Sequence, residues 1–126
     1  MADFAALTAL AASLAHGRDL PGGGSCASVA AAIESASGRV YTGVCIDVAC
    51  SMGFCAEHAA LAAMVTAGET RVRRVVAVHE SGSVVAPCGR CREFLYQIDP
   101  ANLDAEVLLP GGVTTLRALL PHIWNE

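Results

Sequence analysis

The sequence predicts a layered α/β domain in which helices pack against a central β-sheet. Segments with apolar residues at helical spacing alternate with short runs rich in β-branched residues, and this alternation indicates an α/β architecture. The chain has 126 residues, of which 54% are hydrophobic and 16% are charged. That length and composition are typical of one well-packed domain, so we expect a single domain over residues 1–126.

The first half of the chain predicts one helix followed by a pair of strands. Residues 3–16 carry apolar side chains at helical spacing, and Gly17 can end this helix, which we expect to cover one face of the sheet. Residues 28–33 and 39–46 predict two strands, joined in a hairpin by the Ser- and Gly-containing turn at 35–38. The first three elements therefore form a helix and a hairpin.

The second half alternates helices with strands. Residues 55–67 are rich in Ala and Leu and end at Gly68, as a helix does. Residues 72–79 are almost continuously β-branched, which is typical of a strand buried on both faces. The remaining expected elements are a helix at 89–97, a strand at 105–109, a turn at 110–112 and a short helix at 115–120.

Charge and terminal sequence exclude several classes of partner. Eight basic and twelve acidic residues give a net charge of -4, and no block of Lys or Arg is available to neutralise a nucleic-acid polymer. No apolar run approaches the length of a membrane span. Asp3 precedes the first apolar stretch without any basic residue, which is the opposite of a secretory signal. We therefore expect a cytoplasmic protein whose six cysteines are thiols or metal thiolates.

Three cysteines stand where helices are expected to begin. Cys88 and Cys91 follow Pro87 in a Pro-Cys-x-x-Cys pattern, so their thiols lie one helical turn apart and can face one ion. Cys55 at the start of another helix can supply a third thiolate, and the partial positive charge of both helix ends favours ionised sulfur. Thiolates favour zinc over hard cations. The sequence therefore predicts a zinc site.

Three protein ligands leave one position of a tetrahedral zinc open, which is typical of a catalytic site. Glu57 would lie in the first turn of its helix beside that position and could act as a proton shuttle. Two alternatives stay open: His58 could complete a purely structural zinc site, or Cys88 and Cys91 could be a redox pair.

These motifs resemble the signature of the zinc-dependent cytidine deaminase superfamily. The small three-Cys form is the most similar, and within it the blasticidin-S deaminase type. The resemblance extends from about Ser25 to the end of the chain. The motifs that carry it are Cys55-Ala56-Glu57, Pro87-Cys88-x-x-Cys91, Gly38–Val44, Ala86–Glu93, Leu119–Pro121 and Trp124.

The resemblance implies a layered sandwich with a mixed, mostly five-stranded central sheet flanked by helices. It implies Zn²⁺ held by Cys55, Cys88 and Cys91, with Glu57 as the catalytic acid and base. The activity implied is hydrolytic deamination of a free cytosine nucleoside or analogue, of the cytidine, deoxycytidine or blasticidin S type, in a homotetramer whose neighbouring subunits close each pocket. The substrate-binding residues implied are Cys45, Asp47, Ala56, Arg90 and Trp124.

The sequence departs from the family pattern in the part that would bind the sugar. Cytidine deaminases usually carry Asn-x-Glu where this chain has Cys45-Ile46-Asp47. Cys is a poor substitute for Asn, and Asp is one methylene shorter than Glu. We therefore expect a decorated or unusual cytosine analogue more than ordinary cytidine. The alternative function is a non-catalytic, zinc-stabilised oligomeric binding protein with the same fold.

Overall fold

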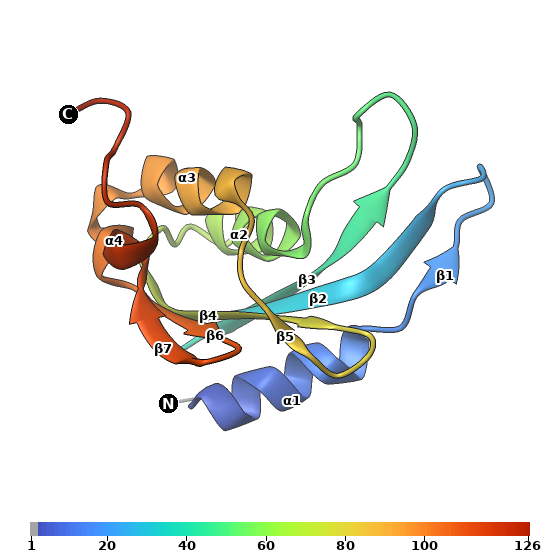
Figure 1. The fold of residues 1–126 in the computed structure, drawn as a ribbon, viewed down its shortest axis with the longest axis horizontal. Coiled ribbons are helices and arrows are strands. Elements are labelled where there is room, and N and C mark those ends of the chain that lie inside the picture. The colour runs from blue at the N-terminus through green and yellow to red at the C-terminus, as the bar shows by residue number, and fades with distance from the viewer. Residues whose placement is uncertain (1–2) are drawn as a thin grey trace.

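The computed structural model describes residues 3–126, and its centre is one mixed β-sheet (Figure 1). The helices are α1 (Phe4–Leu14), α2 (Ala56–Thr66), α3 (Gly89–Ile98) and α4 (Leu116–Leu119), with a 3-10 helix, η1 (Pro100–Asp104). The strands are β1 (Arg18–Asp19), β2 (Ser25–Ser35), β3 (Val40–Asp47), β4 (Val72–His79), β5 (Val84–Val85), β6 (Glu106–Leu109) and β7 (Gly112–Thr115).

Five longer strands form the body of the sheet, in the order β3, β2, β4, β6, β7. The β4–β6 pair is parallel, and the other pairs are antiparallel. The two-residue strands β1 and β5 extend the sheet beside β2 and β4. This arrangement confirms the prediction of a mixed, mostly five-stranded sheet.

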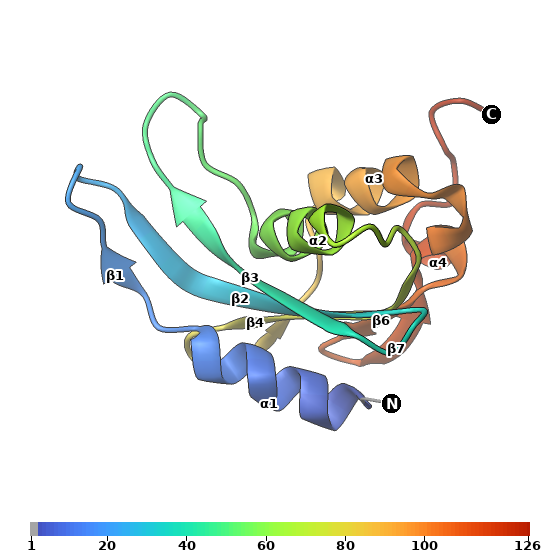
Figure 2. The same ribbon diagram turned by 180° about the vertical axis from the view of Figure 1, so that it is seen from behind.

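Helices cover both faces of the sheet (Figures 1 and 2). Helix α1 lies on one face, where Leu7 and Ala11 pack against β4 side chains such as Val76. Helices α2 and α3 lie on the other, and Leu61 and Leu95 are both fully buried there. The layers exclude water from both faces of β4 over residues 75–78, which is the part of the strand that is continuously apolar, while Arg73, Arg74 and His79 are half-buried.

Helix α2 approaches β3 closely because position 43 is a glycine. A Cβ at Gly43 would lie 2.4 Å from the backbone nitrogen of Ala60, a separation that real Cβ atoms do not show. The close approach brings the start of α2 against the end of β3. Both segments contribute to the pocket described below.

The expected helices and strands are confirmed, with small shifts at their ends. Helix α1 ends at Leu14, before Gly17, and α2, α3 and β4 fall where the sequence predicts them. The sequence did not predict β1, β5, β7 or η1. These elements are two to five residues long, which is too short for a periodic pattern to register. None of the helices in the part of the chain that the structure describes has the length and apolarity needed to cross a membrane.

Candidate functional site

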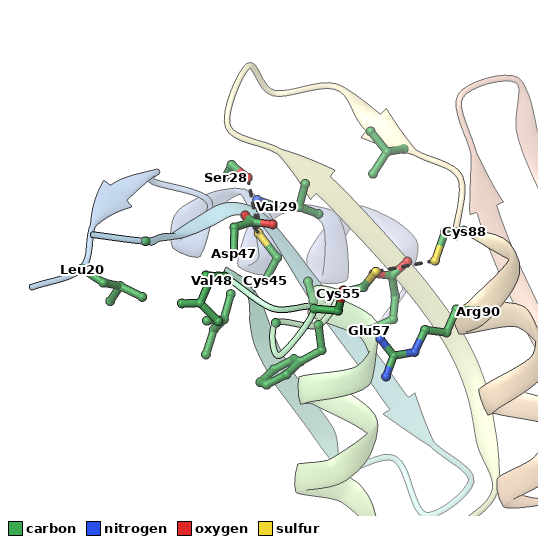
Figure 3. A pocket seen from close by; sticks show the side chains of 18 of the residues that line it. Leu20, Ser28, Val29, Cys45, Asp47, Val48, Cys55, Glu57, Cys88 and Arg90 are labelled. Atoms are coloured by element: carbon green, nitrogen blue, oxygen red, sulfur yellow. Dashed lines mark hydrogen bonds between the residues drawn. The ribbon is translucent and has the colours of Figure 1, made fainter. Parts of the chain in front are cut away.

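A pocket of about 980 Å³ opens where the start of α2, the start of α3 and one end of the β2–β3 hairpin meet. Figure 3 shows its two ends. Cys55, Glu57 and Cys88 stand at one end, and Ser28, Cys45 and Asp47 at the other. The space between them is walled by apolar side chains, among them Val29, Val48, Phe54 and Val85.

The three cysteines at one end of the pocket come from two helix starts. Cys55 is the N-cap of α2 and Cys88 is the N-cap of α3, each with extended backbone, and Cys91 lies in the first turn of α3. Pro87 comes directly before the α3 cap, where its fixed φ suits the entry into a helix. The sequence prediction of three thiols at helix starts therefore matches the local structure.

The sulfurs lie close enough to share one ion. Cys88 Sγ is 3.5 Å from Cys55 Sγ and 3.5 Å from Cys91 Sγ, and the Cys55 and Cys91 sulfurs lie within 4.8 Å of each other. A tetrahedral zinc with Zn–S bonds of about 2.3 Å holds its sulfurs roughly 3.8 Å apart. The three thiols therefore fit a zinc ion by chemistry and by spacing.

His58 is a fourth candidate ligand at the same place. Its Nδ1 atom is 3.3 Å from Cys91 Sγ, and Cys55, His58 and Cys91 together form a group that could hold a metal. The imidazole is stacked on Phe94, with ring centroids 4.2 Å apart and planes 4° from parallel. Stacking holds the ring in an orientation in which Nδ1 faces the Cys91 sulfur.

The thiols differ in how readily they ionise. Burial raises the pKa of the thiols of Cys91 and Cys55. Burial also opposes ionisation of Cys88, but hydrogen bonds from the backbone amides of Cys91 and Arg90 and from the neighbouring thiols outweigh it and lower its pKa. The free amides at the start of α3 therefore favour a thiolate at Cys88, as expected at a helix N-terminus.

Glu57 points into the thiol group from the first turn of α2. The side chain is 5% exposed, and its carboxylate lies beside the sulfurs of Cys55 and Cys88 (Figure 3). Burial raises the pKa of this carboxyl above its usual value. A raised pKa makes the carboxylate a stronger base than an exposed Glu, which suits a group that must take up a proton and return it.

The structure brings four of the five predicted substrate-binding residues to this pocket and leaves one outside. Cys45, Asp47, Ala56 and Arg90 line the pocket. Trp124 lies in the C-terminal segment beyond α4, is 70% exposed and does not reach the pocket of its own chain. Its predicted role in binding substrate stays a prediction.

Sequence reasoning missed two features of the pocket: the turn at residues 49–52, and the part that Ser28 and Val29 of β2 play in the pocket wall. Cys50 and Ser51 both have positive φ, 62° and 58°, and form a tight turn closed by a hydrogen bond from the Met52 amide to the Ala49 carbonyl. Neither residue is Gly or Asn, so the sequence gives no signal for this turn. Ser28 and Val29 were assigned only to a strand, and they form part of the pocket wall.

Comparison with known proteins places the chain among cytidine deaminases. It is 38% identical over 71 residues to a cytidine deaminase of Mycobacterium tuberculosis, a match that covers 56% of this chain and 53%, about half, of that relative. It is 31% identical over 102 residues to a cytidine deaminase of Sporosarcina psychrophila, covering 78% of this chain and 75% of the relative. The crystal structure of the Mycobacterium tuberculosis cytidine deaminase superposes with a TM-score of 0.82 at 30% identity, covering 98% of each chain. No protein-family model matches the sequence.

Proposed function

Because this chain belongs to the cytidine deaminase family, we propose that it is a zinc-dependent hydrolase acting on free cytosine nucleosides or their analogues. The reaction replaces the 4-amino group of the ring by oxygen. One water and one aminopyrimidine are consumed, and a uracil-type product and ammonia are released. The observation that carries the proposal is the burial of Glu57 beside a group of three thiols, two of which, Cys55 and Cys88, line the same pocket as Glu57.

Each residue at this end of the pocket has a separate task. Cys55, Cys88 and Cys91 hold the zinc ion, which when bound supplies a hydroxide nucleophile near neutral pH. Glu57 accepts the proton of the attacking water, protonates N3 of the ring and then passes a proton to the departing amine. Burial of its carboxyl supports this role, because the raised pKa strengthens the carboxylate as the base that accepts the proton.

The opposite end of the pocket surrounds the rest of the substrate. Asp47 and Cys45 line this space, and Asp47 provides a carboxylate that accepts hydrogen bonds from hydroxyl or ammonium groups. Arg90 lies at the thiol end beside Glu57 and Cys88 (Figure 3), as does Ala56, which stands between Cys55 and Glu57 in the sequence. The departure from the Asn-x-Glu pattern supports a decorated or unusual cytosine analogue, such as blasticidin S, over ordinary cytidine.

We further propose a cytoplasmic homotetramer in which residues 1–126 form one domain and neighbouring subunits close each pocket. Trp124 is exposed and far from its own pocket, so in this proposal it stacks on substrate only in a neighbouring subunit. Neither a nucleic-acid polymer nor a membrane is a partner, and the substrate is a small molecule.

A substrate panel tests the activity. Purified protein is analysed for zinc per subunit and incubated with cytidine, deoxycytidine and blasticidin S while the ultraviolet spectrum and released ammonia are followed. We expect close to one zinc ion per subunit and turnover of at least one substrate. Zinc-loaded protein that changes none of these aminopyrimidines would contradict the proposal.

Glu57→Gln tests the proton shuttle. The amide keeps the size of the side chain but cannot carry the proton, so turnover should fall by about 10² to 10⁴ or more while zinc content and fold are retained. Glu93→Gln on α3 is the matched control, because it makes the same change on a half-buried side chain outside the pocket. Turnover by Glu57→Gln at the level of this control would remove Glu57 from the mechanism.

A second candidate function is a zinc-stabilised binding protein without catalysis, favoured by the nearness of His58 Nδ1 to Cys91. In that case His58 fills the fourth position of the ion and no water is activated. His58→Ala distinguishes the two functions. Zinc binding should persist in this variant if three thiolates hold the ion, and it should weaken strongly if the imidazole is a ligand.

A further inference from the structure

The wall of the pocket contains a bulge in β2 that faces a single residue of β3. In the β2–β3 ladder Cys26 pairs with Ile46 and Ala30 pairs with Val44, so the three β2 residues between them stand opposite Cys45 alone. Ala27 at the start of the bulge is fully buried and has a φ of 65°, in the left-handed region that favours glycine. On the β4 side the backbone still holds the bulge, because the Glu80 amide donates to the Ser28 carbonyl at 2.8 Å and Val29 pairs with His79. On the β3 side the ladder is interrupted, so the backbone groups there need a different partner.

The thiol of Cys45 occupies the place of the missing ladder bonds. The Val29 amide donates to Cys45 Sγ at 3.4 Å, and Ser28 Oγ lies 3.3 Å from the same sulfur (Figure 3). Both residues line the pocket. The side chain of Cys45 therefore fixes the segment of β2 that forms the pocket wall.

The same thiol reaches the carboxylate at this end of the pocket. Cys45 Sγ lies 3.8 Å from Asp47 Oδ2. When the Ser28 hydroxyl and the Val29 amide both donate to the sulfur, the thiol hydrogen can point to the Asp47 carboxylate. We propose that Cys45 is a positioning residue, which couples the β2 bulge to Asp47 and acts on the substrate through that carboxylate.

This assignment differs from a direct contact between the thiol and the substrate. Cys45 is only 8% exposed, and its one donor and its acceptor capacity are directed at Ser28, Val29 and Asp47. Asp47, in contrast, is exposed in the pocket. A substrate group with hydrogen-bond donors, a hydroxyl or an ammonium, would therefore meet the carboxylate and not the sulfur. The inference rests on the proposed function for its kinetic consequence, but the anchoring of the bulge can be measured without it.

The first arm of the test measures hydrogen exchange of the Val29 amide by NMR in the zinc-loaded protein. Cys45→Ala removes the acceptor, so exchange of this amide should accelerate by about tenfold or more. Cys45→Ser keeps an acceptor and a donor and should largely preserve the protection. Cys26→Ala is the control, because Cys26 is a buried β2 cysteine outside the pocket, and it should leave the exchange unchanged.

The second arm measures kinetics with the substrate that the wild-type chain turns over. Cys45→Ala should raise KM about tenfold with kcat changed by less than about threefold, and it should add little to Asp47→Ala because Cys45 acts through that carboxylate. Cys45→Ser should restore most of the KM.

Three results would overturn the proposal: a raised KM with unchanged Val29 exchange, faster exchange with unchanged KM, or independent effects of the Cys45 and Asp47 substitutions. If wild-type protein turns over nothing, the proposed function fails. Unchanged Val29 exchange in Cys45→Ala would then still overturn the anchoring, and faster exchange would support it.

Discussion

Replacing Asn102 by alanine tests whether one buried amide holds the end of α3 against the start of β4. The side chain is fully buried in η1. Its Oδ1 accepts the Val72 amide at 2.8 Å, and its Nδ2 donates to the carbonyls of Thr70 and Leu95, each at 3.0 Å. The amide therefore joins η1 both to α3, which precedes it directly, and to the segment at the start of β4, 30 residues earlier in the sequence.

The expected loss follows from these three bonds. Alanine leaves the Val72 amide, which is 3% exposed as a residue, without its acceptor, and an unsatisfied buried donor costs about 1–3 kcal/mol. Two lost donations to carbonyls bring the decrease in the free energy of unfolding to about 3 kcal/mol. For 126 residues this corresponds to a decrease in Tm of about 10 °C.

Thermal and urea unfolding, followed by circular dichroism at equal protein and zinc concentrations, measure this loss. Gln97→Ala is the matched control, because that amide is exposed on α3 and bonds only to Glu93 one turn away at 2.7 Å. We expect the control to change stability by less than about 0.5 kcal/mol. If Asn102→Ala is destabilised no more than the control, the reasoning from buried hydrogen bonds is wrong.

Two further predictions concern charged side chains. Arg74→Met should lower the free energy of unfolding by about 1.5–3 kcal/mol, because it removes the charge-assisted hydrogen bond between the guanidinium and the fully buried Glu34 carboxylate 2.7 Å away. Glu34→Gln combined with it should recover part of the loss in a double-mutant cycle. Hydrogen bonds with Ser37, Tyr41 and Ser35 hold the pKa of the Glu69 carboxyl below its usual value. The ionised carboxylate therefore stabilises the fold at pH values above the usual pKa, and this stabilisation is lost as the pH falls through the lowered pKa. Glu69→Gln should therefore flatten the decline of the urea midpoint below about pH 4.5, and identical acid profiles for variant and wild type would contradict this.

The main elements and the placement of three thiols at helix starts could be predicted because their signals are local. Gly68 marks the end of a helix, and the valines between residues 72 and 79 indicate a strand. Neither signal depends on residues elsewhere in the chain. Pro87 and the spacing of Cys88 and Cys91 place two thiols in one helical turn. Cys55 stands at the start of a second helix, and it could be added to the pair because a thiol there can lie beside Cys88 and Cys91.

The bulge at Ala27 could not be predicted, because alanine carries no preference for the left-handed region and nothing nearby in the sequence indicates a break in the ladder. The role of Cys45 depends on the same break. Asn102 likewise looks like an ordinary loop residue until its three partners come together.

The amino-acid sequence by itself determined the helices, the longer strands, and the thiols with a neighbouring carboxylate, because helix caps, periodicity and ligand spacing act over a few residues. Only the tertiary structure decided how these parts converge. It brought Cys55 to within 3.5 Å of Cys88, set His58 against Cys91, tied Cys45 to the bulge of β2 and left Trp124 outside its own pocket. These outcomes depend on contacts between distant segments, whose geometry is fixed by the packing of both helix layers on one sheet and not by local preference.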